Sequence, residues 1–277
     1  MARGENRSDA LIIHRDARDL AGTAPTFRRI EVASICVFPI LFAWLLVRTW
    51  SAMRAPSLVF LGFFTGFLFA DFISGFFHWF FDTWFSPNTP YIGKAFVRTF
   101  REHHVDPTAI CRHDFVETNG SNVLAGSFLV FVGHLADSAY VAVSLLFTGL
   151  FMSATSQIHK WAHADRVPRV VAFMQRVRLI LPKTMHDEHH AAPFDRAYCI
   201  TNGWLNATLH HVRFFRFLER LIRVTTGALP RRDDIGEIAA LTVAEEDPVV
   251  SCDVHGDACV VVTAAQEGFV DERACDE

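Results

Sequence analysis

Histidine is the residue type in this chain that is best suited to metal chemistry. The sequence has 277 residues and 14 histidines. Most of them fall in four clusters, which read HWFFD at 78–82, EHH at 102–104 with a further histidine at 113, HKWAH at 159–163 and HDEHH at 186–190. Residues three or four apart on a helix share a face. Within the clusters, histidine or aspartate recurs at these spacings, so each pair can bind one metal ion or two adjacent ions.

Together the clusters supply ten candidate ligands. They are His78, Asp82, His103, His104, His113, His159, His163, His186, His189 and His190. One tetrahedral zinc ion takes about four ligands, so ten suit two ions with about five each. Imidazole-rich sites fit zinc, copper, iron or nickel. Two redox-active irons that react with O2 would use all ten ligands, and we therefore expect a di-iron centre with no catalytic residue beyond its ligands.

Asp71 is a further candidate, because it lies in an apolar segment where a carboxylate is costly. It precedes His78 by seven residues and lies on nearly the same helix face. This placement suggests an outer partner that hydrogen-bonds a ligand histidine. The equally open alternative is that Asp71 pairs with Ser74 or with a backbone group inside the bundle.

The elements that position these residues are apolar helices. Hydrophobic residues make up 51% of the chain, with 27 phenylalanines, and the mean hydropathy is +0.22. The runs 30–47 and 57–77 approach the roughly 20 apolar residues that cross a bilayer. The run 123–151 is too long for one untilted span and has His134, Asp137 and Ser138 in its middle. It predicts two shorter spans joined by a tight hairpin, with a single tilted helix as the alternative. We expect an all-α integral membrane protein with about four transmembrane helices.

Composition divides the chain into three parts. Residues 1–29 form a polar arm, residues 30–226 a membrane domain, and residues 227–277 an acidic, weakly structured tail. From 231 to 277 there are 13 acidic and 3 basic residues, a net charge of −10. A Val-rich stretch at 249–262 could still form a strand or hairpin. The segments 167–181 and 213–224 interleave arginines with apolar residues, which is typical of helices that lie in a membrane interface.

The distribution of basic residues predicts the orientation. The arm has six arginines, the loop 85–122 has four basic residues, and the region 156–226 has eleven, whereas the turn 48–56 has two. Basic segments stay in the cytosol. With four spans, both termini and all histidine clusters then lie in a cap on the cytosolic side.

Four stretches of the sequence resemble the Kua/CarF-type membrane lipid desaturases. They are 71–84, 98–122, 157–163 and 181–206, and the similarity extends over about 55–215. The resemblance implies two Fe ions on the ten ligands, O2 as co-substrate, and an external electron-transfer protein of the cytochrome b5 or ferredoxin type. It implies a membrane phospholipid substrate, best matched by the alkyl ether chain of an ethanolamine phospholipid, where desaturation forms the vinyl ether bond of plasmalogens.

Two departures from the family pattern leave the lipid open. Met185 and Phe194 stand where the plasmalogen-forming members usually have histidine. A fatty-acyl lipid desaturase or hydroxylase of the same family is therefore the alternative, as in the plastid relative that desaturates palmitate in phosphatidylglycerol. A non-enzymatic membrane metal-binding or transport protein is the rival from another class. It should place ionisable residues along a path near the bilayer midplane, whereas these histidines cluster at span ends and in loops. No nucleic-acid partner is expected.

Overall fold

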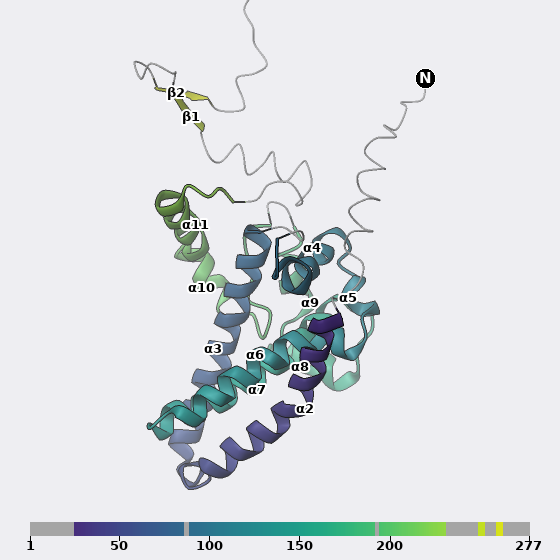
Figure 1. The fold of residues 1–277 in the computed structure, drawn as a ribbon, viewed down its shortest axis with the longest axis vertical. Coiled ribbons are helices and arrows are strands. Elements are labelled where there is room, and N and C mark those ends of the chain that lie inside the picture. Colours follow the sequence, from purple (N-terminus) through teal and green to yellow (C-terminus); the bar gives the residue numbers. More distant parts are fainter. Residues whose placement is uncertain (1–24, 86–88, 192–193, 231–248, 253–258, 263–277) are drawn as a thin grey trace, which may run out of the picture.

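Four long helices form the body of the protein (Figure 1). The computed structural model describes residues 25–85, 89–191, 194–230, 249–252 and 259–262. The long helices are α2 (Pro25–Arg48), α3 (Pro56–Thr83), α6 (Phe115–Leu135) and α7 (Ala139–His163). Helix α2 begins five residues before the predicted first span, so the end of the expected polar arm is helical. The short 3₁₀ turn η1 (Ala52–Arg54) joins α2 to α3.

The outward faces of these helices suit contact with lipid. On α2, Ile40, Trp44 and Val47 are 67%, 62% and 72% exposed, and Phe60 and Phe128 on α3 and α6 are similarly exposed. Large apolar side chains clustered on a surface mark a membrane or partner contact. Three helices, namely 26–48, 56–83 and 139–163, are long and apolar enough to cross a bilayer. The protein is thus a helical integral membrane protein, while a fourth span through α6 stays a prediction.

Helices α6 and α7 form the predicted hairpin. Helix α6 ends at Leu135 and α7 begins at Ala139, so one tilted helix over 123–151 is excluded. Ser138 caps α7 by accepting a hydrogen bond from the backbone N–H of Val141, and Asp114 caps α6 in the same way from Glu117. Such caps satisfy N–H groups that have no partner within the helix.

Helix α7 is central, because it packs against both α6 and α3, while α2 packs mainly against α6. The α6–α7 contact depends on two glycines that face one another. A Cβ on Gly126 would lie 2.6 Å from the carbonyl oxygen of Gly149, and a Cβ on Gly149 would lie 2.5 Å from Cγ2 of Val130. Small residues let membrane helices approach closely, and dispersion forces then hold them together.

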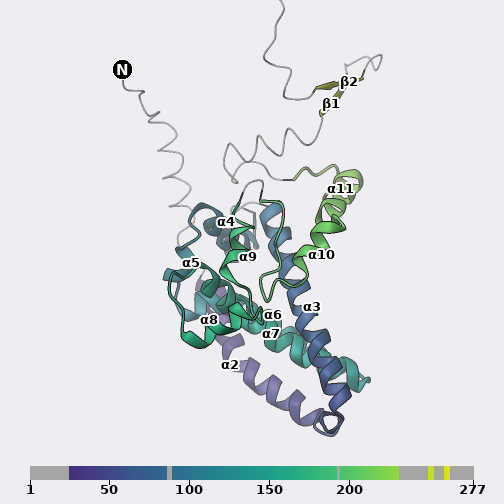
Figure 2. The same cartoon turned by 180° about the vertical axis from the view of Figure 1, so that it is seen from behind.

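Short helices cover the C-terminal end of α3 from two sides (Figures 1 and 2). On one side lie the π-helical turn η2 (Gly93–Val97), α4 (Arg98–Val105), α5 (Ala109–Arg112) and α9 (Lys183–Asp187). On the other side lie α10 (Asn206–His211) and α11 (Phe214–Thr226). Helix α8 (Arg169–Arg176) follows α7. The segment 167–181 thus contains α8, and the segment 213–224 forms most of α11, while their place in a membrane interface stays a prediction.

The only strands among the described residues lie in the tail. Strands β1 (Val249–Cys252) and β2 (Cys259–Val262) pair antiparallel, with Val249 opposite Val262 and Cys252 opposite Cys259. The all-α expectation is therefore correct for the membrane domain, and the Val-rich stretch forms the hairpin that its β-branched residues favour. The prediction of a weakly structured tail otherwise falls on residues outside the described part of the chain.

Candidate metal centre

Four helices bring the histidine clusters together. His78 and Asp82 lie in the last two turns of α3, and His159 and His163 end α7. His103 and His104 lie on α4, while His186 lies on α9 and is followed by His189 and His190 in the next turn. Nine of the ten predicted ligands converge in this way, and they form two groups.

The first ligand group consists of five imidazoles whose Nε2 atoms point at one another. Its members are His103, His159, His163, His186 and His190. The Nε2 of His186 lies 2.7 Å from that of His163, 2.8 Å from that of His159 and 3.2 Å from that of His190. Two nitrogens bound at about 2.1 Å to one ion, at a right angle, are about 3.0 Å apart. The spacings therefore fit the coordination sphere of one metal ion.

The second ligand group is built around a carboxylate. The Oδ2 of Asp82 lies 3.3 Å from Nε2 of His78, 3.2 Å from Nε2 of His104 and 3.3 Å from Nε2 of His189. These three Nε2 atoms and both Asp82 oxygens are buried, and none has a hydrogen-bond partner. Unpaired buried polar atoms are costly. A metal ion bound between them would satisfy all of them at once, so these residues fit a second ion.

The two groups are neighbours, because adjacent residues divide between them. His103 joins the first group and His104 the second, and their ring centroids are 5.5 Å apart. In the same way His190 joins the first group and His189 the second, and their ring centroids are 5.3 Å apart. Successive residues on a helix point about 100° apart. A single helical turn can therefore supply one ligand to each of two neighbouring metal ions.

Two backbone carbonyls orient histidines of the second group. The Nδ1 of His78 lies 3.0 Å from the carbonyl oxygen of Tyr198, and the Nδ1 of His189 lies 2.9 Å from that of Arg196. A proton donated from Nδ1 to a carbonyl leaves the lone pair of Nε2 for a metal. Backbone carbonyls carry no residue-type signal, so the sequence could not reveal Arg196 and Tyr198 as positioning residues.

Asp71 does not contact a ligand histidine, which corrects the prediction of an outer ligand partner. Its Oδ1 accepts the backbone N–H groups of Asn202 and Gly203 at 2.8 and 2.9 Å, and its Oδ2 accepts that of Leu205 at 3.2 Å. The structure thus shows the alternative, in which Asp71 bonds to backbone groups inside the bundle. By fixing the loop after Tyr198 to α3, Asp71 holds in place the segment whose carbonyls orient His78 and His189.

His113 lies outside both ligand groups. Its Nε2 is 3.2 Å from a carboxylate oxygen of Glu102, which in turn pairs with Arg98 at 3.1 Å. Arg98 also pairs with Glu117 at 2.9 Å. The prediction of ten direct ligands is therefore reduced to nine in this structure, because an ion pair network holds the tenth away from the centre.

Burial keeps three histidines of the first ligand group, His103, His186 and His190, neutral. Loss of solvent, reinforced by the neighbouring imidazoles, lowers the pKa of His103 and of His186 well below the ordinary value. The same causes lower the pKa of His190 to about 2. Only the unprotonated imidazole binds a metal ion. These three imidazoles are therefore in their ligating form at neutral pH.

A largely apolar groove of about 580 Å³, here called the substrate groove, opens onto the first ligand group. His103 and His159 line it at the centre, beside Glu102 and His113. Away from the centre it is lined by apolar side chains, among them Phe77, Leu124, Phe128 and Met152, and Phe77 and Phe128 are exposed on the surface of the bundle. A concave, mostly apolar site with a few polar groups at one end suits a lipid chain.

The two departures from the family pattern have different surroundings. The ring of Phe194 lies 5.7 Å from that of His104, so it stands beside the second ligand group. Met185 packs against the apolar cluster that includes Ile158 and Leu181. Phe194 therefore replaces a residue that could reach the centre, whereas Met185 takes part in the core beneath it.

The exposed apolar helices and the buried, two-part histidine centre define an integral membrane protein built to hold metal ions. The model of the lipid desaturase domain matches residues 67–233, which contain all nine converging ligands. The chain belongs to this lipid desaturase family and is an oxidoreductase, which sets aside the reading as a non-enzymatic metal transporter.

Curated relatives support this assignment over most of their length. A plasmanylethanolamine desaturase of Myxococcus xanthus is 46% identical over 248 residues, which are 85% of this chain and 88% of the relative. Plasmanylethanolamine desaturase 1 of Mus musculus is 42% identical over 80% of this chain and 87% of its own. Chloroplastic fatty acid desaturase 4 of Arabidopsis thaliana is 31% identical over 61% of this chain and 53% of its own. No solved structure matches the chain significantly.

Proposed function

We propose that this desaturase uses two iron ions and O2 to form the vinyl ether bond of plasmanylethanolamine. The observation that carries the proposal is the juxtaposition of nine converging ligands in two groups with an apolar groove that ends at His103 and His159. The names of the two plasmanylethanolamine desaturases that resemble the chain over most of its length support this substrate.

The reaction removes two hydrogens from adjacent carbons of the lipid and reduces O2 to two water molecules. The lipid gives two electrons and two protons, and an external carrier and the solvent give two more of each. Bound iron supplies the activation of O2 and the abstraction of hydrogen from an unactivated carbon. The nine side chains hold the ions, and the surrounding cap keeps water from the reacting carbons.

The polarity of the substrate groove supports a bond close to the headgroup. Glu102, His113 and Glu117 line its end at the centre, while Leu124 and Phe128 line it about two and three turns further along α6 than Glu117. A phospholipid bound with its polar part beside Glu102 places the first carbons of its chain at His103. The vinyl ether bond forms at those carbons, next to the ether oxygen.

Fatty-acyl desaturation is the second candidate. The 31% identity with a chloroplastic fatty acid desaturase and the position of Phe194 against His104 favour it. We propose further that the centre faces the cytosol, where an electron carrier of the cytochrome b5 or ferredoxin type can reach it, because the basic segments flank the histidine clusters.

Metal and lipid analysis together test the proposal. The purified protein should contain close to two irons per chain, and cells that otherwise lack vinyl ether lipids should gain them on expression. Zinc in place of iron, or iron far below one per chain, contradicts the di-iron centre. A new double bond in fatty-acyl chains with no vinyl ether product contradicts the substrate and leaves the metal assignment standing.

A further inference from the structure

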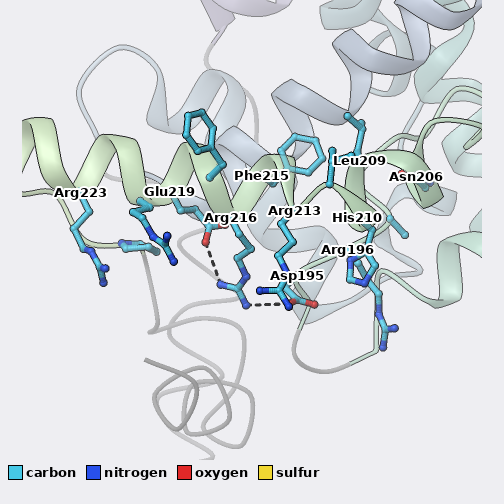
Figure 3. A pocket seen from close by; sticks show the side chains of 15 residues that line it. Asp195, Arg196, Asn206, Leu209, His210, Arg213, Phe215, Arg216, Glu219 and Arg223 are labelled. Carbon is cyan, nitrogen blue, oxygen red and sulfur yellow. Dashed lines mark hydrogen bonds and ion pairs between the residues drawn. The ribbon is translucent and has the colours of Figure 1, made fainter. Parts of the chain in front are cut away.

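A second groove, of about 650 Å³, lies on the other side of α3 from the substrate groove. It is formed by α11, α10 and the loop at 195–197, and we call it the arginine groove. Figure 3 shows Arg213, Arg216 and Arg223 projecting from one side of α11 and its N-cap, opposite Phe215, whose ring packs against Trp79 of α3. The two grooves share no lining residue.

The charge of the arginine groove is strongly positive. Its lining includes Arg196, Arg213, Arg216, Arg220 and Arg223. The lining carboxylates are Asp195 and Glu219, and both pair with Arg216, at 2.9 and 3.0 Å. The five arginines and two carboxylates of the lining together carry a net charge of +3. Arg196, Arg213 and Arg220 are exposed. A concave surface with one sign of charge attracts and orients partners of the opposite sign.

The wall of the arginine groove is one hydrogen bond from the metal centre. Arg196 lines the groove, and its carbonyl oxygen accepts the hydrogen bond from His189 of the second ligand group at 2.9 Å. A path of aromatic rings also leads from the arginine groove to the second ligand group. The ring of Phe215 lies 4.9 Å from that of Tyr198, which lies 5.2 Å from His189. Electron transfer falls steeply with distance, so a carrier that docks here has a short route to the second ligand group.

We propose that the arginine groove is the docking site of an acidic one-electron carrier protein, an inference that rests on the proposed function. Each turnover needs two electrons from outside the lipid, delivered one at a time, so the carrier must bind and leave repeatedly. Exposed charges suit this, because they raise association rates without tight binding. A site opposite the substrate groove also lets the carrier bind while the lipid is in place.

Two other occupants would use the same charge. The acidic tail leaves the described part of the chain after Pro230, which lines the groove, and anionic lipid headgroups also bind arginines. Neither needs the short route from Arg196 and Tyr198 to the second ligand group. That proximity favours the carrier, and the experiment separates the three.

The test reverses two groove charges in the full-length enzyme, in vesicles of neutral phosphatidylcholine with the ether lipid substrate. The variant is Arg213→Glu with Arg220→Glu. Reduced soluble cytochrome b5 domain and reduced ferredoxin serve as probes. The KM for at least one carrier should rise about tenfold or more, with kcat at saturation and bound iron unchanged. The matched control, Arg169→Glu with Arg176→Glu on α8, should leave the KM unchanged.

A single turnover of dithionite-reduced enzyme with O2 separates this inference from the proposed function. All variants should form the same amount of product there, because no carrier is needed. Absence of product in the unmodified enzyme refutes the proposed function itself. If product forms but the Arg213→Glu, Arg220→Glu variant has the same KM for both carriers as the control variant, the docking site is refuted.

Two further outcomes also overturn the proposal. An effect that appears only in vesicles with anionic lipid would assign the groove to headgroups. Loss of the effect when Glu245, Glu246 and Asp247 are replaced by their amides would assign it to the tail.

Discussion

Asp82 makes the two ligand groups chemically different. The first group has five neutral imidazoles, while the second has three imidazoles around a carboxylate oxygen at 3.2–3.3 Å. A carboxylate adds a negative charge that partly offsets the charge of a bound ion. The second group also has the two carbonyl partners that fix its histidines. The two sites should therefore differ in metal affinity and in redox behaviour.

Single replacements distinguish ligands from their neighbours. His163→Ala and His189→Ala should each lower bound iron from about two to one or fewer per chain and abolish activity, with membrane insertion intact. His113→Ala is the comparison, and it should keep its iron, because His113 pairs with Glu102 outside both groups. Iron analysis of the three purified variants checks this. Full iron in His163→Ala or His189→Ala, with normal turnover, would refute the ligand assignment. Iron loss in His113→Ala would show that His113 is a ligand and does not lie outside both groups.

At the scale of elements, the loop between α9 and α10 is fixed to α3 along several residues. Asp71 accepts three backbone N–H groups of this loop, and Ser74 accepts that of Ile200 at 3.1 Å. Gly75, which follows Ser74 on α3, lets Cys199 approach α3 closely. Because the same loop supplies the carbonyls for His78 and His189, its position on α3 sets the geometry of the second ligand group.

Gly75→Ala tests this coupling. The new Cβ would lie 2.4 Å from the Sγ and 3.1 Å from the backbone nitrogen of Cys199, so the loop must move. We expect a loss of iron from the second ligand group and a stability cost of about 1–3 kcal/mol, the usual range for an overpacked core. Iron analysis and thermal unfolding measure the two effects. Adding Cys199→Ala should restore part of both, and an unchanged Gly75→Ala protein would show that the loop does not set the site.

At the scale of the whole molecule, the helix bundle and the cap divide the work. The bundle presents apolar side chains outward and carries the substrate groove, while the cap encloses the metal ligands at one end of α3 and α7. The arginine groove lies beyond α3, on the opposite side. Lipid and electrons would thus reach the centre from different directions.

The distribution of basic residues predicts that both termini lie in the cytosol. Single cysteines introduced at Ser51, in the turn after α2, and at Ser8, in the N-terminal arm, report on the two sides. An impermeant thiol reagent added to intact cells should label the first and not the second, after replacement of the native cysteines. Labelling of the arm from outside would show that the four-span orientation is wrong.

Removal of the tail should leave desaturation largely intact. Truncation after Gly227 deletes a segment with a net charge of −10 between 231 and 277, and no ligand or groove-forming helix is lost. A segment so acidic gains little from burial. Lipid analysis of cells that carry the truncated chain measures the product. Loss of product at an unchanged protein level would make the tail a functional part of the enzyme.

Much of the site could be predicted from local patterns. Helical spacing determines that His159 and His163, or His78 and Asp82, share a face, and apolar runs determine where the long helices lie. The polar residues at 134–138 determine the break between α6 and α7. These features depend only on neighbouring residues, so the sequence by itself contains them.

The tertiary structure decided how the clusters combine. Whether His103 or His104 faces His159 depends on how α4 lies across α3 and α7, and this follows from packing between segments far apart in the chain. Long-range packing also places Glu102 beside His113 and Asp71 beside the backbone of the loop at 202–205. It likewise brings the carbonyls of Arg196 and Tyr198 to the ligand histidines. Helical periodicity fixes directions within one helix, whereas a metal centre requires directions from four elements to meet, and only long-range packing sets those.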